Sequence, residues 1–91
     1  MSNNESIFIG SKPIMSYVTA VITALRKADE VKILARGRAI TNAVDVVELT
    51  KRNFMTDIIV NSISIGTEKI SEGNDVRNVS TIEITLSKKK S

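Results

Sequence analysis

The chain has 91 residues, the size of one domain, and its 13 lysines and arginines against 10 acidic residues give a net charge of +3. It contains no cysteine and no histidine. Disulfides, thiolate metal sites, cysteine nucleophiles and imidazole acid–base catalysis are therefore excluded, and we expect no enzyme activity, no metal and no cofactor. A charge excess this small is compatible with an anionic partner but does not identify one.

No apolar run approaches the roughly 20 residues that a membrane span needs, and residues 1–5 lack the basic and apolar regions of a signal peptide. We therefore expect a cytoplasmic protein with no membrane partner. Residues 1–91 should form a single domain, with a polar tail at 1–5 and a basic tail at 87–91. Because a domain this short has a small core, we expect oligomerisation to contribute to its stability.

The first half of the chain predicts a strand and then a helix. The strand covers residues 6–9. Pro13 suits the first helical position, where its missing N–H costs nothing, so Ser11 or Lys12 would lie at the cap. The helix should end near Lys27, and its buried stripe would consist of Ile14, Val18, Val21, Ile22 and Leu25.

A second strand and a second helix follow. Alternation over residues 31–36 predicts the strand, and Gly37 ends it. The helix should run over about residues 39–53. We expect its buried side to carry Ile40, Ala43, Val44 and Val47, and its exposed side to carry Asp45, Glu48 and Arg52.

Two further strands are predicted over residues 57–67 and 79–86, which are rich in β-branched side chains. These strands should pair as a hairpin. The polar residues 68–78 between them exceed the usual length of a hairpin loop, so we expect a long loop that is either functional or loose. The predicted element order is βαβαββ.

The placement of cations suggests a partner. If the first two strands are parallel neighbours with a right-handed crossover, both strand-to-helix turns open at one edge of the sheet, which places Lys12 near Arg36 and Arg38. Cations have the wrong sign for a helix N-terminus, and a bound phosphate would resolve that conflict. Gly10 and Gly37 would let a nucleic-acid backbone approach closely. The alternative is that these cations are solvated surface charges.

The sequence resembles the Alba family of archaeal chromatin proteins. The resemblance lies in residues 9–15 (IGSKPIM) and residues 35–40 (ARGRAI), followed by residues 43–45 (AVD), and it extends over roughly residues 7–88. It implies a βαβαββ fold of the α/β (α+β sandwich) class, with a four-stranded mixed sheet and two helices on one face. The C-terminal domain of bacterial translation initiation factor three has the same fold. The resemblance to the Alba family also implies a homodimer that binds double-stranded DNA without sequence preference. RNA binding also occurs in the family.

Carried over to this chain, the resemblance implies phosphate contacts at the two turns and a hairpin of residues 68–78 that reaches along the flanking minor groove. The candidate nucleic-acid-binding residues are Ser11, Lys12, Arg36, Gly37, Arg38, Lys69 and Arg77. Phe54 stands where the family has an aromatic at a contact between dimers, although packing in the core is the alternative for this ring. Two placements are likewise open for Tyr17: its side chain packs in the core, or its hydroxyl lies near a phosphate.

The sequence departs from the family at three positions. Ser11 stands where many members have a lysine that is linked to acetylation, so that switch is excluded, while Lys12 is still open to modification. Leu34 and Asn42 replace residues that are often basic. The surface is therefore less cationic than usual, and affinity for DNA should be reduced.

We therefore expect a chromosome-associated protein that coats or compacts DNA and has no small-molecule substrate. The first rival is an RNA-binding protein or a ribonucleoprotein subunit that uses the same basic residues. A pure assembly module with incidental charges is the second rival. A phosphate-ester hydrolase is the third, and it would need Asp29, Glu30 or Asp45 to converge on the turns.

Overall fold

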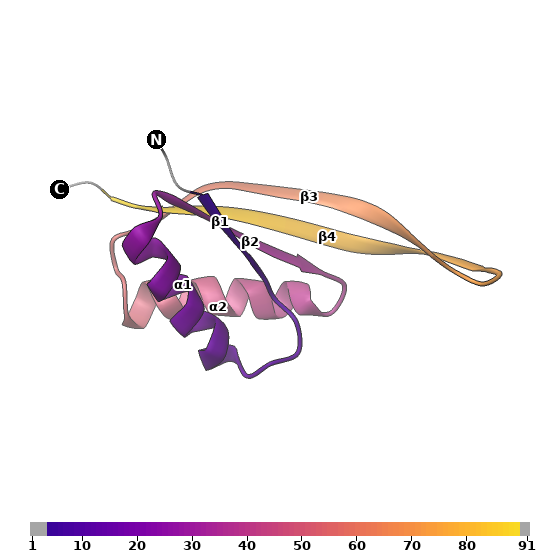
Figure 1. Cartoon of the computed structure of the whole chain (residues 1–91), viewed down its shortest axis with the longest axis horizontal. Helices are drawn as coiled ribbons and strands as arrows, with labels where there is room; N and C mark the ends of the chain where they lie inside the picture. The colour runs from indigo at the N-terminus through magenta and orange to yellow at the C-terminus, as the bar shows by residue number, and fades with distance from the viewer. Residues whose placement is uncertain (1–3, 90–91) are drawn as a thin grey trace.

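The structure is a computed structural model that describes residues 4–89. In chain order its elements are β1 (Asn4–Phe8), α1 (Ile14–Lys27), β2 (Glu30–Arg36), α2 (Ala39–Asn53), β3 (Ile58–Glu72) and β4 (Asp75–Lys88). The strands form one four-stranded sheet in the order β1-β2-β4-β3, in which β1 and β2 are parallel and β4 is antiparallel to both its neighbours. Both helices lie on one face of the sheet, so the expected βαβαββ fold is confirmed (Figure 1).

The core lies between the helices and the face of the sheet that they cover. Val31, Ile33 and Ala35 of β2 are buried, as their alternation predicted, because successive side chains of a strand point to opposite faces. From the other elements the core takes Val18, Val21 and Leu25 of α1, Ala43, Val46 and Val47 of α2, and Ile84 and Leu86 of β4.

The buried side of α2 differs from the prediction at three positions. Val44 is exposed, whereas Val46 and Thr50 are fully buried. The stripe follows Ala43, Val46, Val47 and Thr50, which is the i, i+3, i+4, i+7 spacing of one helix face. Thr50 is compatible with burial because its hydroxyl donates a 2.7 Å hydrogen bond to the Val46 carbonyl one turn earlier.

The helix starts lack the features that usually stabilise them. Pro13 itself is the N-cap of α1, in an extended conformation, so neither Ser11 nor Lys12 occupies the cap as predicted. Neither α1 nor α2 has a side-chain cap hydrogen bond or an acidic residue in its first turn. The positive end of each helix dipole is therefore not compensated by a nearby carboxylate of the first turn.

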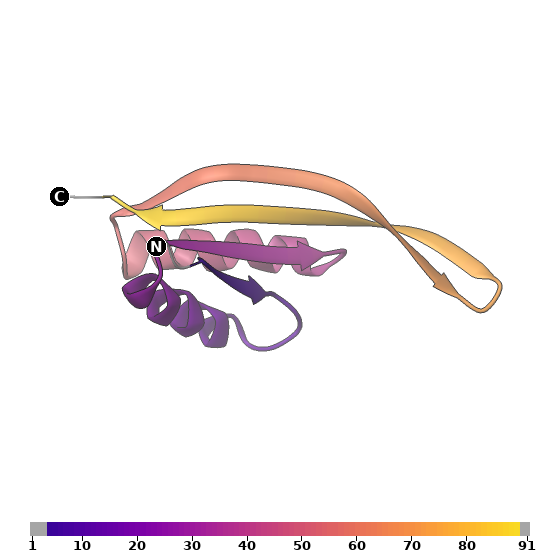
Figure 2. The ribbon, with the colours of Figure 1, turned by 45° about the horizontal axis from the view of Figure 1, so that its top comes forward.

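The largest difference from the prediction concerns residues 68–78, which form no loop. The β3–β4 ladder continues to the pair Glu72 and Asp75, so only Gly73 and Asn74 make the turn. Gly73 has φ +60, and a glycine at the first position of a two-residue turn is typical of type II′ hairpins. The polar composition arises because this ribbon extends past the helices, so neither of its faces lies over a core (Figures 1 and 2).

Candidate nucleic-acid interface

The two strand-to-helix turns lie at the same edge of the sheet, as predicted. Because β1 and β2 run parallel, the chain leaves both strands at the same end (Figure 2). Asn42 of α2 links the two turns, since its side-chain amide donates a 3.4 Å hydrogen bond to the Gly10 carbonyl. Lys12, Arg36 and Arg38 are all exposed. We call these three residues the basic edge.

The turn between β1 and α1 is held by Tyr17. The phenol is buried, and its oxygen accepts hydrogen bonds from the backbone N–H of Gly10 at 2.9 Å and of Lys12 at 3.1 Å. A Cβ placed on Gly10 would lie 3.3 Å from that oxygen. The glycine therefore makes room for Tyr17, and the core alternative for Tyr17 is the correct one.

The turn between β2 and α2 depends on a left-handed residue. Gly37 has φ +60, a conformation that is costly for residues with a side chain. Its N–H donates to the Ser80 carbonyl of β4 at 2.8 Å, and its carbonyl accepts from the N–H of Ile40 at 3.2 Å. The turn is thereby anchored to the sheet, and Arg36 and Arg38 project from either side of it.

These contacts limit the predicted phosphate site, which was expected to combine exposed backbone N–H groups of the two turns with the adjacent cations. The backbone N–H groups of Gly10, Lys12 and Gly37 already have acceptors within the protein. Recognition of an anion at this edge therefore depends on the side-chain cations and on the first turns of the helices.

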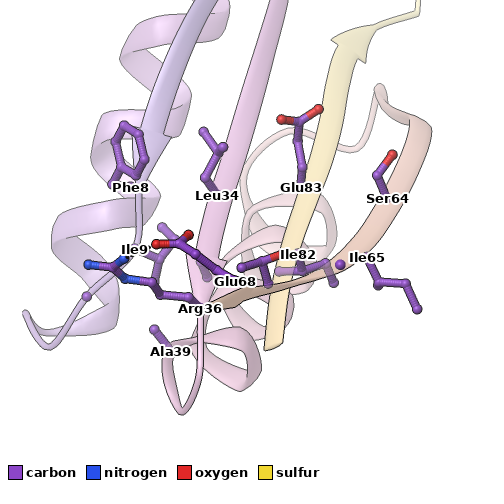
Figure 3. A pocket seen from close by; sticks show the side chains of 14 residues that line it. Phe8, Ile9, Leu34, Arg36, Ala39, Ser64, Ile65, Glu68, Ile82 and Glu83 are labelled. Carbon is purple, nitrogen blue, oxygen red and sulfur yellow. Dashed lines mark hydrogen bonds and ion pairs between the residues drawn. The ribbon is translucent and has the colours of Figure 1, made fainter. Parts of the chain in front are cut away.

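Arg36 has a partner that the sequence did not predict. Its Nη1 donates to Oε1 of Glu68 at 2.9 Å, and the two side chains are 61% and 50% exposed. Figure 3 shows them meeting at the end of the sheet, close to Phe8. The residue pair Gly73 and Asn74 could have predicted this contact, because it is typical of a two-residue hairpin turn. A tight turn there extends the ladder and pairs Glu68 with Val79.

The other basic candidates of the hairpin lie apart from the basic edge. Lys69 of β3 pairs with Asn78, and Arg77 of β4 pairs with Ile70, so the two cations point to opposite faces of the ribbon. Both are exposed. The hairpin thus presents one cation on each of its faces, and neither forms an ion pair within residues 4–89.

Phe54 lies at the C-terminal cap of α2, and its ring is 51% exposed. The core alternative for this residue is therefore wrong. Arg38 caps the opposite end of the same 15-residue helix, which is about 22 Å long. A contact made by Phe54 would consequently be separate from a contact made by the basic edge.

Strand β3 leaves apolar side chains uncovered at the edge of the sheet. Ile63 and Ile65 pair with Ile84 and Ile82, which places them on the side of the sheet that carries the helices. They are nevertheless exposed, Ile65 by 83%. We call Ile63 and Ile65 the apolar edge.

Residues 4–89 contain no group of three or more acidic side chains arranged to hold a metal ion. None of the helices in the same range is long and apolar enough to cross a membrane.

The fold and the candidate site define a small two-layer α+β domain with a basic edge and a projecting hairpin. The profile of the Alba family matches residues 5–67, and this chain belongs to that family. The "DNA/RNA-binding protein Alba 1" of Archaeoglobus fulgidus is 51% identical to it, covering 93% of this chain and 97% of its own. The "DNA/RNA-binding protein Alba" of Methanothrix thermoacetophila is 46% identical and covers 97% of this chain and 100% of its own.

Solved structures agree with these relatives. Alba from Thermoplasma volcanium superposes with a TM-score of 0.86 at 44% identity, covering 91% of this chain and 99% of its own. The crystal structure of ALBA1 from Trypanosoma brucei superposes with a TM-score of 0.77 at 29% identity, covering 93% of this chain and 69% of its own. The resemblance found in the two sequence motifs is thus confirmed for both family and fold.

Proposed function

We propose that this protein binds double-stranded DNA without sequence preference, as a homodimer, and that it coats or compacts the chromosome in the cytoplasm. The observation that carries the proposal is the basic edge, in which three exposed cations project from two adjacent turns. The names of the archaeal relatives, DNA/RNA-binding protein Alba, point to nucleic acid as the partner. Binding, rather than catalysis, is the activity we assign.

The chemistry of the basic edge favours phosphate contacts. Lys12 and Arg38 lie beside helix starts that have no acidic residue in the first turn, so the local potential is positive. Contacts to phosphate position a protein on a duplex but carry no sequence information. Affinity without sequence preference follows from such contacts.

The hairpin would extend the footprint on the duplex. The described part of the molecule is 53 Å long, and the hairpin forms one end of it (Figure 1). Because Lys69 and Arg77 lie on opposite faces of the ribbon, a hairpin that follows a groove offers a cation to the backbone on either side. Its polar side chains need no apolar partner there.

A second copy of the chain would cover the apolar edge. Ile63 and Ile65 are adjacent positions of one face on an edge strand whose outer side has no neighbour in the sheet. Burying such side chains contributes about 1.5–3 kcal/mol each, which matters for a core this small. Dimerisation would also bring two basic edges into one particle.

RNA binding is the second candidate, and Phe8 favours it. Its ring is 75% exposed on the face of the sheet that the helices leave open, in one row with Leu34 and Glu83 (Figure 3). An exposed aromatic ring beside cations is suited to stacking on an unpaired base, a contact that single-stranded parts of RNA offer.

Fluorescence anisotropy tests the proposal with matched DNA and RNA duplexes over a salt series. If each dimer neutralises about six phosphates, log K against log salt should have a slope of about −5. The variant Lys12→Ala/Arg36→Ala/Arg38→Ala should lose most of its affinity and show a flatter slope. A flat salt response of the wild-type protein would contradict phosphate binding.

A matched control removes the same charge elsewhere. Arg26, Lys51 and Arg52 are exposed cations in the last turns of the two helices, away from the basic edge. Their triple alanine variant should bind nearly as well as the wild type, and circular dichroism should show both variants folded. Equal losses in the two variants would mean that only net charge matters.

A further inference from the structure

We propose that Glu68 occupies the place of a nucleic-acid phosphate in the free protein, so that Arg36 becomes available for binding only by exchanging this carboxylate for a phosphate. The inference rests on the function proposed above and concerns the regulation of the same basic edge. It predicts that Glu68 lowers the affinity for nucleic acid.

The strand register explains why these two residues meet. Arg36 of β2 pairs with Thr81 of β4, and Thr81 pairs with Gly66 of β3, so these three form one row across the sheet. Glu68 lies two positions beyond Gly66 and therefore projects from the same face. Because Gly66 has no side chain, nothing from β3 in that row separates the Glu68 carboxylate from the Arg36 guanidinium.

The contact has the chemistry of a phosphate contact. A guanidinium binds carboxylates and phosphates through the same charge-assisted N–H donors. At 2.9 Å it is shorter than the other two ion pairs within residues 4–89, which are Lys27 with Glu5 at 4.0 Å and Lys32 with Glu83 at 3.9 Å. Arg36 thus already has an anionic partner where a phosphate would bind.

The pair is nevertheless exposed enough to exchange. Both side chains are at least half accessible, and exposed ion pairs contribute little to stability because water and salt compete for them. Within the same described residues, neither Lys12 nor Arg38 has a carboxylate at ion-pair distance. Of the three cations of the basic edge, Arg36 alone must therefore release an internal anion.

The released carboxylate would continue to act after the exchange. Glu68 is the first residue of the hairpin of residues 68–78. We call the rest of this hairpin, residues 69–78, the outer hairpin, so Glu68 lies between it and the basic edge. A duplex that contacts both would have this negative charge close to its phosphates. Glu68 therefore opposes binding in two ways, by occupying Arg36 and by repelling the backbone.

The experiment is a double-mutant cycle in the full chain. Glu68→Gln removes the charge and keeps the shape, and Arg36→Gln removes the partner. Affinities of wild type, both single variants and the double variant are measured by anisotropy for one DNA duplex and the matched RNA duplex. Glu68→Gln should tighten binding by about three- to tenfold, since an exposed pair contributes at most about a factor of five in each subunit.

The matched control is Glu72→Gln. Glu72 lies on the same strand and the same face of the ladder, four residues further along, and pairs with Asp75 at the turn. Removing it changes the net charge equally, but its effect should be the same whether or not Arg36 is present. The gain from Glu68→Gln should instead be clearly smaller in the Arg36→Gln background, where only the repulsion between Glu68 and the phosphates is left to relieve.

The outcomes separate the inference from the proposed function. Coupling between Glu68 and Arg36, without coupling between Glu72 and Arg36, supports the exchange. An equal gain from Glu68→Gln in both backgrounds, or weaker binding by that variant, overturns it while duplex binding by the wild type stands. A wild type that binds neither duplex overturns both. Thermal unfolding of each variant confirms that the comparison is made between folded proteins.

Discussion

The hydroxyl oxygen of Tyr17 accepts a 2.9 Å hydrogen bond from the backbone N–H of Gly10. A buried residue of α1 thereby determines the path of the turn that carries Lys12, whose own N–H also bonds to the phenol. The Lys12 part of the basic edge is therefore positioned by a residue of the protein core.

The first prediction follows from that contact. Tyr17→Phe keeps the buried ring but leaves the N–H groups of Gly10 and Lys12 without their acceptor. We expect a loss of about 1 kcal/mol in the free energy of unfolding, together with several-fold weaker duplex binding. Urea unfolding and anisotropy measure the two effects. Thr23→Val, on the exposed side of α1, is the control and should change neither. Unchanged affinity in Tyr17→Phe would show that the turn keeps its path without the phenol.

The second prediction concerns Gly37. Its φ of +60 makes Gly37→Ala cost about 1–2 kcal/mol of stability, because a Cβ disfavours the left-handed conformation. Gly37→Asn should cost less, since asparagine adopts this conformation more readily. Both losses are read from chemical unfolding. The added Cβ would lie 3.5 Å from Cγ1 of Val79, which is ordinary van der Waals contact, so space is not the obstacle. Equal losses for alanine and asparagine would contradict the left-handed backbone conformation as the cause.

The third prediction separates the hairpin from the basic edge. Lys69→Ala/Arg77→Ala should weaken binding to a duplex of about 30 base pairs but leave binding to one of about 10 base pairs almost unchanged, since a short duplex cannot reach along the hairpin. Anisotropy with the two lengths makes the comparison. Proportional losses on both duplexes would place the hairpin cations in the central contact instead.

The fourth prediction tests the dimer. Ile65→Asp puts a charge on the apolar edge, and a dimer that buries this edge should dissociate, because an unpaired buried charge is strongly unfavourable. Light scattering after size-exclusion chromatography should then give half the wild-type mass. Val76→Asp, at an exposed apolar position of the outer hairpin, is the control and should leave the mass unchanged. A wild type that is monomeric at all concentrations would contradict this interface.

The fifth prediction assigns Phe54 to contacts between bound dimers. Because its ring is half exposed, Phe54→Ala should cost less than about 1 kcal/mol of stability. Binding to a short duplex that accommodates one dimer should be unchanged, while cooperativity on long DNA should fall. Titrations on the two lengths measure both. Cooperativity that survives the substitution would exclude this ring from the contact.

Local patterns predicted most of the architecture because each reports a property of a single element. Alternation over β2 and the stripe of α1 identified their buried faces correctly, since burial follows directly from strand and helix periodicity. The prediction that Val44 of α2 is buried was wrong. The helix carries apolar residues on more than one face, and packing against the sheet determines which of them are buried. The outer hairpin was mistaken for a loop because its strands have no buried face to create a pattern.

The sequence by itself determined the element order, the family through two motifs, and the cations Lys12, Arg36 and Arg38, because these depend on residues close together along the chain. Only the tertiary structure decided what those residues contact. Tyr17 meets Gly10 through the packing of α1, and Glu68 meets Arg36, 32 residues away, through the register of β2, β4 and β3. Contacts of this kind depend on how strands align across a sheet, and that alignment is set by backbone hydrogen bonds and core packing that no local pattern records.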